Sequence, residues 1–269
     1  MMNAIEQKNV VDARWNFNGN IKVGDIATWS TLPSDRIFVS EVFGEVKGTC
    51  PPECCEHCGK AKEGKVLPPC YVFKSHRFPS VIDGQARNTL SIRNNPELAC
   101  EQLSGYLKRK KNPVVAARFD QSGEGENKRQ FRGFASIAVD NENLPFYIYS
   151  KQFAILVEML LNGEFPKNFT VLFSIWHEQG IEEYLKVAHL PNVKAFVYCD
   201  KNSDPINGWG AEEYAEHGIH IQTWCKAYGM DGKMNHDITC DHCQKCFNMI
   251  KDGKPVVRKS AKVIGCWDH

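Results

Sequence analysis

The sequence has no long apolar run, no excess of either charge and no familiar catalytic loop. No stretch approaches the ~18 uninterrupted apolar residues of a membrane-spanning helix, and the first residues lack the apolar core of a secretion signal. Lys and Arg number 33 against 32 Asp and Glu, which leaves a formal net charge of +1. This balance does not indicate binding to nucleic acid or to an anionic membrane. We therefore expect a cytoplasmic protein.

Motifs that identify common enzymes are also missing. The sequence contains no phosphate-binding loop, no hydrolase nucleophile elbow, no zinc-protease motif and no internal repeat. Hydrophobic residues at 42% and charged residues at 24% are ordinary globular values, which excludes wholesale disorder. A chain of 269 residues is long enough for a large core, either as one barrel or as two domains.

Apolar runs alternate with helical patterns from residue 113 onward. Strands are expected at 24–30, 114–119, 146–149, 169–176, 193–198 and 219–224. Such alternation is typical of parallel strands joined by right-handed crossovers. About six units favour an α/β fold with a partial (β/α)6 barrel of the TIM type, and an open doubly wound sheet is the second interpretation.

The N-terminal part shows little periodicity. The first hundred residues are predicted to be irregular up to a helix that begins at Asn95 and Pro96. This helix ends in a basic run, 108–111, which we interpret as a solvated end whose cations suit the helix dipole; contact with phosphate is the alternative. The expected organisation is an irregular segment 1–112 that forms part of the barrel, β/α repeats over 113–225 and a Cys-rich extension over 226–269.

Twelve cysteines are many for a chain without an export signal, and most of them are clustered. Clusters of this kind favour metal ligation over a disulfide scaffold. In the C-terminal group, Cys240, Cys243 and Cys246 follow one another at intervals of three, and Cys225 lies fifteen residues earlier. Four thiolates suit a tetrahedral zinc ion or a four-iron cluster, and the even spacing favours iron–sulfur. A dithiol or a disulfide is the alternative.

The N-terminal group offers more thiols than one metal site needs. We assign Cys50, Cys54, Cys58 and Cys70 to a second metal centre, and the choice between Cys54 and Cys55 stays open. Outside the two groups, Cys100 and Cys199 are expected to be small buried core residues, and Cys266 is left without a role.

A polar turn follows the apolar run that ends at Phe119. In Ser122–Gly123–Glu124, the glycine would allow the backbone to approach a ligand and Glu124 could receive an ammonium group. An ordinary surface turn is the alternative. The position after a predicted parallel strand favours a ligand site, because such sites lie at the carboxyl ends of the strands.

Several segments resemble the phage and prophage "gene product 88" family. They are residues 27–33, 48–50, 70–80, 86–90, Arg118 with 122–124, 146–151, 166–169 and the C-terminal cysteines. The resemblance covers residues from about 20 to 250. The resemblance implies that the protein, if a phage encodes it, is located in the cytosol of a bacterial host.

At a greater distance, the layout is similar to that of radical S-adenosylmethionine enzymes. Those enzymes have a six-unit partial barrel, a three-cysteine cluster loop after the first strand and a Gly-Gly-Glu-type motif after the second. The resemblance implies that Ser122, Gly123 and Glu124 hold the amino group of S-adenosylmethionine and that the C-terminal cysteines form an auxiliary cluster. No cysteine triple between 50 and 70 has the usual spacing of that cluster loop.

We therefore expect an iron–sulfur protein of phage type, with 4Fe–4S clusters and the features of a radical S-adenosylmethionine-like enzyme. Its substrate, small molecule or macromolecule, is not identified by the sequence. The alternative is a non-enzymatic binding protein that is stabilised by zinc and engages a host protein or nucleic acid.

Overall fold

The computed structural model describes most of the chain and divides into two compact units. The described residues are 9, 12–17, 24–52, 71–109, 113–176, 178, 180–199, 209–226, 235, 237–251, 254–256 and 262–267. The helical unit comprises residues 1–15, 29–111 and 120–137, and the sheet unit comprises residues 16–28, 112–119 and 138–269. Each unit combines segments that are distant in sequence, so long-range contacts are needed to form both.

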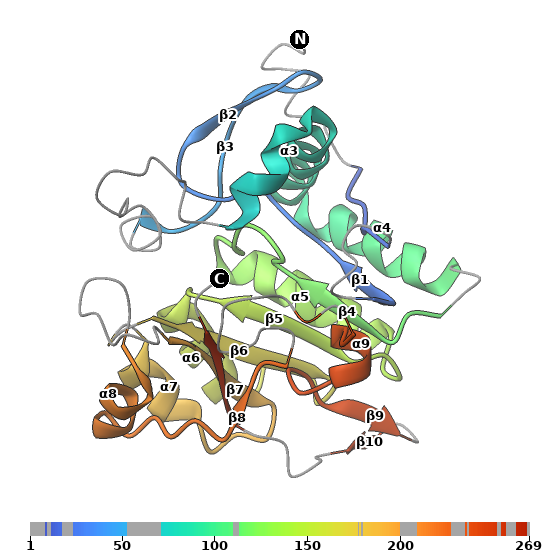
Figure 1. Cartoon of the computed structure of the whole chain (residues 1–269). Coiled ribbons are helices and arrows are strands. Elements are labelled where there is room, and N and C mark those ends of the chain that lie inside the picture. Colours follow the sequence, from blue (N-terminus) through green and yellow to red (C-terminus); the bar gives the residue numbers. More distant parts are fainter. Residues whose placement is uncertain are drawn as a thin grey trace, which may run out of the picture. The chain divides into compact units, whose positions relative to one another are not determined.

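The sheet unit is built on seven parallel strands (Figure 1). In spatial order they are β1 (Ile26–Thr28), β4 (Ala116–Phe119), β5 (Phe146–Ser150), β6 (Phe169–Ile175), β7 (Val193–Cys199), β11 (Val263–Trp267) and β8 (Thr223–Trp224). Every neighbouring pair is parallel. The order follows the chain without reversal from β1 to β7, and β11 is inserted between β7 and β8. The fold is therefore mixed α/β with a parallel sheet, as the alternating pattern predicts.

Side chains along the strands alternate between two faces of the sheet. We call the first the helix face. On it, three stacked rings join neighbouring strands, with centroids 5.8–6.4 Å apart: Phe119, Phe146 and Phe169. Helices α6 (Phe153–Leu161) and α7 (Ile181–Val187) cover this face, because Phe153 and Tyr184 both pack on Phe173. Burial on this face explains the apolar residue at every second position of these strands.

The second face, which we call the loop face, is covered by chain from the C-terminal part. Its buried cluster consists of Ile26, Ala116, Tyr147, Leu172, Ile264 and Phe247. The Phe247 ring stacks on Tyr147 with centroids 4.9 Å apart. This covering chain contains helix α9 (Cys240–Cys243) and an antiparallel pair, β9 (Met249–Lys251) and β10 (Lys254–Val256). A further helix, α8 (Ala211–Glu216), precedes β8.

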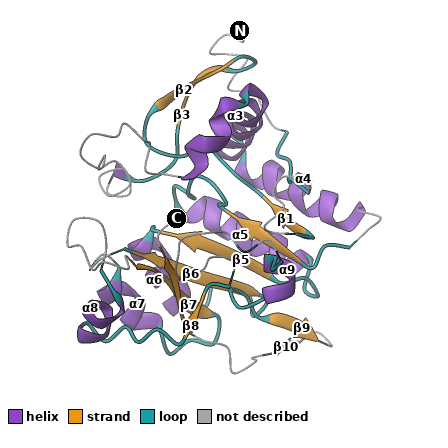
Figure 2. Ribbon diagram, in the orientation of Figure 1, coloured by secondary structure: helices purple, strands orange, loops and turns teal. Residues whose placement is uncertain are grey.

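The helical unit contains three longer helices (Figure 2). Its elements are β2 (Ile37–Ser40), β3 (Gly44–Lys47), the 3-10 helix η1 (Tyr71–Arg77), α3 (Pro79–Asn94), α4 (Pro96–Arg109) and most of α5 (Lys128–Asp140). Helix α4 begins where the sequence predicts, because the Asn95 side chain accepts a hydrogen bond from the Leu98 N–H (3.1 Å). Helix α5 is one of the helical patterns expected after residue 113, and its Phe131 and Phe134 side chains are fully buried.

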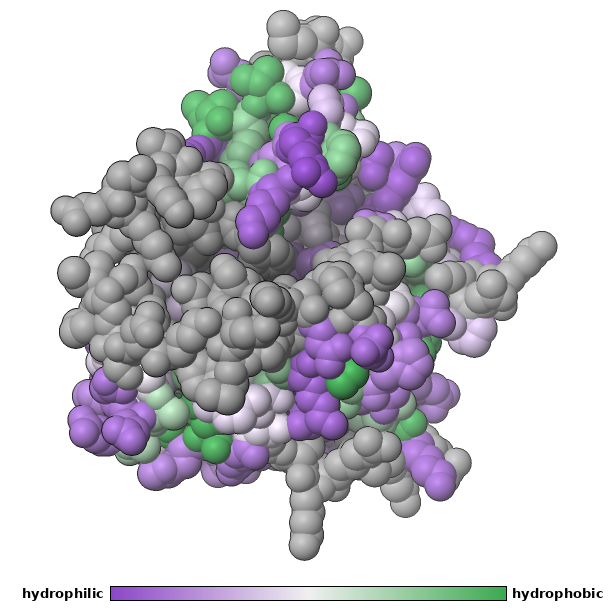
Figure 3. Space-filling model, in the orientation of Figure 1, coloured by the Kyte–Doolittle hydropathy of each residue, from purple (hydrophilic) through white to green (hydrophobic). Residues whose placement is uncertain are grey.

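The β2–β3 hairpin has one apolar side that is exposed. Phe38 and Ser40 point toward the unit, whereas Ile37 and Val39 are 64% and 65% exposed. Figure 3 shows apolar side chains gathered over this hairpin. The alternation follows from the period of two in a strand that is buried on one side only.

The irregular N-terminal segment predicted from the sequence is wrong for α3 and for the β2–β3 hairpin. Helix α3 buries polar residues, including Gln85, Asn88, Thr89 and Ser91, so it has no apolar period to detect. The strand expected at 219–224 is reduced to β8, and the structure adds β11, which the sequence did not indicate.

None of the helices in the described ranges is both long enough and apolar enough to cross a membrane. This finding agrees with the apolar runs of the sequence, none of which reaches the length of a span.

Candidate functional site

The four cysteines of the C-terminal group are brought together on the loop face of the sheet unit. Three of their side chains pack against the buried cluster of that face: Cys225, Cys240 and Cys246. Burial is the main reason that the pKa of the Cys246 thiol rises to about 12. Three neighbouring thiols raise this pKa further: Cys240, Cys225 and Cys243. All four predicted ligands are therefore close neighbours in space.

Local structure explains how three of them are grouped. Cys240 and Cys243 are the first and last residues of α9, so they lie one turn apart on the same side of the helix. Gln244 then adopts a left-handed conformation (φ 54°), and its N–H bonds to the Cys240 carbonyl at 2.9 Å. This cap ends the helix and turns the chain so that Cys246 returns to the sheet.

Cys225 comes from a different element. It directly follows β8, and its N–H donates to the Gly265 carbonyl of β11 at 2.7 Å. The position of Cys225 therefore depends on β11, which lies between β7 and β8 and pairs with β8 in parallel.

The chain over residues 240–248, which we call the C-terminal cysteine loop, is anchored at the amino ends of the strands. The Asp241 carboxylate accepts a hydrogen bond from the N–H of Asp25, the residue before β1 (3.1 Å). The Lys194 ammonium, at the second residue of β7, donates to the Lys245 carbonyl (2.7 Å). Close contact at Gly24 supports the first anchor, because a Cβ there would lie 2.3 Å from the Asp241 carboxyl carbon.

Two further contacts lie at the same edge of the sheet. The Asn248 N–H donates to the hydroxyl of Thr170, the second residue of β6 (3.2 Å), and its side-chain amide donates to the Pro191 carbonyl before β7 (3.2 Å). Cys225 follows the carboxyl end of β8, but the anchors of the C-terminal cysteine loop lie along the amino edge of the parallel sheet. In β/α folds this is the edge associated with stability, whereas the carboxyl edge carries the chemistry.

Two cations and two buried tyrosines share the loop face with the thiols. Lys194 is 1% exposed, and burial lowers the pKa of its ammonium group to about 8. Burial also raises the pKa of Tyr147 and of Tyr149 well above its usual value. The Arg118 guanidinium lies over the Tyr149 ring, 4.4 Å from its centroid, and adds a second cation to this face.

The donor set fits a metal centre in its chemistry. Four soft thiols suit zinc or an iron–sulfur cluster, and two cations are available to offset the charge of four thiolates. Within the described part of the chain, no three His, Cys, Asp or Glu side chains already converge in the geometry of a bound metal ion. The four thiols therefore lie near one another on the loop face but are not arranged as a group that could hold a metal ion.

The N-terminal cysteine group is placed only in part. Cys50 lies in the helical unit, where its N–H donates to the Ser34 carbonyl at 3.1 Å. Three other predicted ligands, Cys54, Cys58 and Cys70, lie outside the described residues, as does Cys55.

The Ser122–Gly123–Glu124 turn is buried and held by a network within the helical unit. The Thr31 N–H donates to the Ser122 carbonyl (2.9 Å), and the Ser122 hydroxyl donates to the Thr31 carbonyl (3.0 Å). The Glu124 N–H donates to the Thr49 hydroxyl (2.8 Å). Glu124 is only 5% exposed, which excludes an ordinary surface turn.

Gly123 is required by the close approach of these segments. Its φ is +74°, and a Cβ would lie 2.0 Å from the Thr31 hydroxyl and 2.5 Å from the Thr49 hydroxyl. Both hydroxyls belong to segments that carry the family resemblance, so sequence similarity was the signal that could have identified Thr31 and Thr49. Asp120 belongs to the same polar segment; its carboxylate accepts the Gly125 N–H (2.7 Å) and closes the turn.

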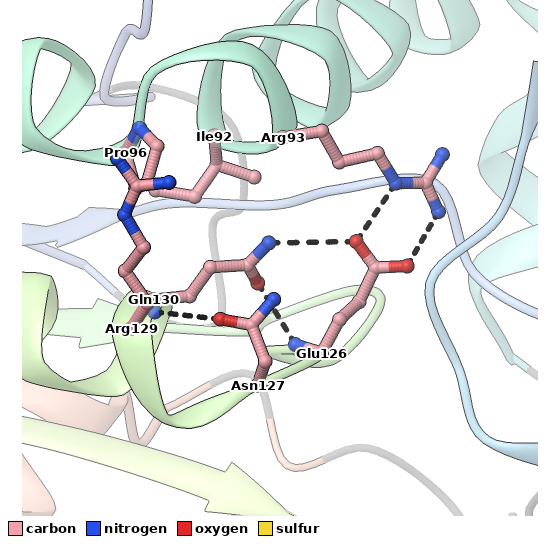
Figure 4. A pocket seen from close by; sticks show the side chains of 7 residues that line it. All are labelled: Ile92, Arg93, Pro96, Glu126, Asn127, Arg129 and Gln130. Carbon is pink, nitrogen blue, oxygen red and sulfur yellow. Dashed lines mark hydrogen bonds and ion pairs between the residues drawn. The ribbon is translucent and has the colours of Figure 1, made fainter.

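A small pocket beside this turn is lined in part by Arg93, Glu126 and Gln130 (Figure 4). Arg93 binds Glu126 through two hydrogen bonds (2.6 and 2.7 Å) and also donates to the carbonyls of Lys47 and Gly48. It therefore ties the segment before Thr49 to the segment after Glu124. We interpret this arrangement as a brace for the turn, since the ion pair already satisfies both charges.

The thiols outside the two groups are core residues. Cys100 and Cys199 are buried, and burial raises the pKa of each to about 12, which keeps both protonated and unreactive. Cys266 is also buried, as part of β11.

Comparison with known proteins identifies one family. No curated protein and no solved structure gives a significant match to the chain. The family model described as "gene product 88" matches residues 14–254, a span that includes the Ser122–Glu124 turn and all four C-terminal cysteines. Because this match covers most of the sequence, the chain belongs to the gene product 88 family.

Proposed function

We propose that this protein is an iron–sulfur protein in which Cys225, Cys240, Cys243 and Cys246 hold a four-iron cluster. The observation that carries the proposal is the grouping of these four thiols on the loop face, although Cys225 comes from a separate strand end. The even spacing of the last three cysteines favours a cluster over zinc, which typically uses paired knuckles.

We assign a structural role to this centre. Its four cysteine ligands leave no open position for a substrate, which is typical of structural sites. The loop that carries three of them covers the amino edge of the sheet through Asp241, Lys194 and Asn248 contacts. Ligation would join this loop to the end of β8, so that metal binding contributes folding free energy.

The Ser122–Glu124 turn is the proposed site of a cofactor with an amino group, namely S-adenosylmethionine. Support comes from the buried Glu124 carboxylate and from the backbone of the turn, which Thr31 and Thr49 hold in place. When bound near an iron–sulfur cluster, this cofactor would supply radical chemistry. Glu124 would orient its ammonium group, and the buried network would limit the access of water.

Two further elements of the proposal rest on the sequence pattern. Cys50, Cys54, Cys58 and Cys70 would hold a second cluster, and the parallel sheet would curve into a partial barrel. The steady strand order from β1 to β7 supports the barrel, because right-handed crossovers then place the helices on one face. The substrate class is open.

The test is purification without oxygen, followed by iron, sulfide and zinc analysis. We expect a brown protein with iron and acid-labile sulfide, and Cys243→Ser should lose one cluster. Cys100→Ser is the matched control, because Cys100 is a buried thiol outside both groups and its replacement should leave the metal content unchanged. Stoichiometric zinc without iron, even after cluster reconstitution, would favour the non-enzymatic, zinc-stabilised binding protein instead. Equal metal content in wild type and Cys243→Ser would refute the ligand assignment.

A further inference from the structure

Three arginines of the helical unit lie around Tyr106, away from the turn and the pocket described above. Arg14 belongs to the extended segment 12–15, Arg87 to α3, and Arg109 to the last turn of α4. The Arg109 guanidinium lies over the Tyr106 ring, 5.2 Å from its centroid. Tyr106 also interacts electrostatically with Arg14 and with Arg87. We call this group the arginine cluster.

The position of Arg14 is fixed by its backbone. The Asn88 side chain accepts the Arg14 N–H (3.0 Å) and donates to the Arg14 carbonyl (3.1 Å), so one amide holds both sides of this residue. The rest of the segment is held by three single hydrogen bonds: the Asp12 N–H donates to the Ser91 hydroxyl, the Ala13 N–H to the Gln102 side-chain carbonyl, and the Trp15 ring N–H to the Leu103 carbonyl. The fold thus places a half-exposed guanidinium beside Arg87, although like charges repel.

Arg87 is the unusual member of the cluster. It is half-buried, and its Nε atom is enclosed without a hydrogen-bond partner. In the described part of the chain Arg87 makes neither a hydrogen bond nor an ion pair. Burial lowers the pKa of Arg87, and the charge of Arg14 lowers it further. A buried donor without a partner is rare and requires an explanation.

The nearby carboxylates do not neutralise Arg87. Asp12 is bound by Arg14 through two contacts of 3.0 and 2.6 Å. Asp83, one turn before Arg87 on α3, accepts the Ser40 hydroxyl (2.6 Å) and the Glu41 N–H (3.0 Å). Both acids are bound to other groups, so among the described residues neither of these carboxylates pairs with Arg87.

We propose that the arginine cluster binds a phosphate group, with Arg87 as its principal donor and Arg14 and Arg109 at its side. A guanidinium presents a planar fork of donors that matches the oxygens of phosphate. The group could belong to inorganic phosphate or to the backbone of a single-stranded nucleic acid. The net charge of the protein does not bear on this choice, because a local cluster determines the field at the site.

The test uses the full-length protein and two probes: inorganic phosphate, and a single-stranded oligonucleotide at low ionic strength. We expect at least one of them to bind saturably, as measured by calorimetry and by the rise in Tm. Binding of phosphate alone assigns a small phosphate ligand. Binding of the oligonucleotide that phosphate displaces assigns the nucleic-acid backbone as the source. Binding of neither probe overturns the proposal.

Variants connect the binding to Arg87. Arg87→Gln should weaken it about tenfold or more, whereas Arg87→Lys keeps the charge and should retain part of the affinity. Arg129→Gln is the control, because Arg129 is an exposed arginine of the same unit that is paired with Glu97. Affinity in folded Arg87→Gln equal to that of wild type would overturn the proposal. If Arg87→Gln does not fold, Arg14→Gln provides the same comparison.

Discussion

Gly123→Ala tests whether the Ser122–Glu124 turn depends on the close approach seen in the structure. The new Cβ would stand 2.0 Å from the Thr31 hydroxyl and 2.5 Å from the Thr49 hydroxyl, and both contacts are far shorter than van der Waals distance. Alanine at a φ of +74° also adopts a left-handed conformation that L-residues disfavour.

The expected loss of stability follows from these two effects. The left-handed backbone costs about 1–2 kcal/mol for alanine. Displacing the buried hydroxyls of Thr31 and Thr49, which lie 3.0 Å apart and bond to each other, adds about 1–3 kcal/mol because their partners are left unsatisfied. We therefore expect Gly123→Ala to reduce the free energy of unfolding by about 2–5 kcal/mol.

Gly163→Ala is a matched control. Gly163 has nearly the same φ (+69°), but nothing lies within 4 Å of the position of its Cβ. It should therefore show the backbone effect alone, about 1–2 kcal/mol.

The free energies of both variants can be measured by urea denaturation with circular dichroism. Hydrogen exchange should also show lost protection at the Thr31 and Glu124 N–H groups in Gly123→Ala only, since those two groups donate into the turn. Equal losses of stability in the two variants, with protection retained, would refute the close approach.

Three further predictions concern other parts of the molecule. Cys243→Ser should lower both metal content and Tm, whereas Cys100→Ser should alter Tm alone; unchanged metal content in Cys243→Ser would contradict this. Burial lowers the pKa of His76 below its ordinary value of 6.5, so the unfolded state binds more protons. Stability should therefore decline as the pH falls below about 6.5, and a His76→Gln variant with the same decline would exclude this origin. Gly24→Ala should displace the Asp241 carboxylate and destabilise the protein by about 2–4 kcal/mol, measured by urea denaturation; no change in stability would argue against that anchor.

The parallel sheet could be predicted from local pattern. Strands β4, β5, β6 and β7 are mostly apolar, and the helices between them have their own apolar period. Burial on both faces forces apolar residues at successive positions, so this signal is present in the sequence itself. The start of α4 was equally clear, because the cap at Asn95 is a local interaction.

Other elements are decided by partners far along the chain. Helix α3 buries polar side chains such as Asn88 and Thr89, each of which forms a hydrogen bond with a segment 57 or more residues away. A polar residue is stable in a core only when it meets its donor or acceptor, and the sequence does not show where that partner will be.

The two candidate sites divide in the same way. The spacing of the C-terminal cysteines indicated a metal centre, because ligands that are close in sequence can surround one ion. The location of that group on the loop face of the sheet was decided by tertiary structure, through the insertion of β11 and the anchors of Asp241 and Lys194. Tertiary structure also determined that the Arg87 Nε atom has no hydrogen-bond partner. The surroundings of Arg87 depend on how α3 packs against segments that are distant in sequence, such as the one that contains Arg14.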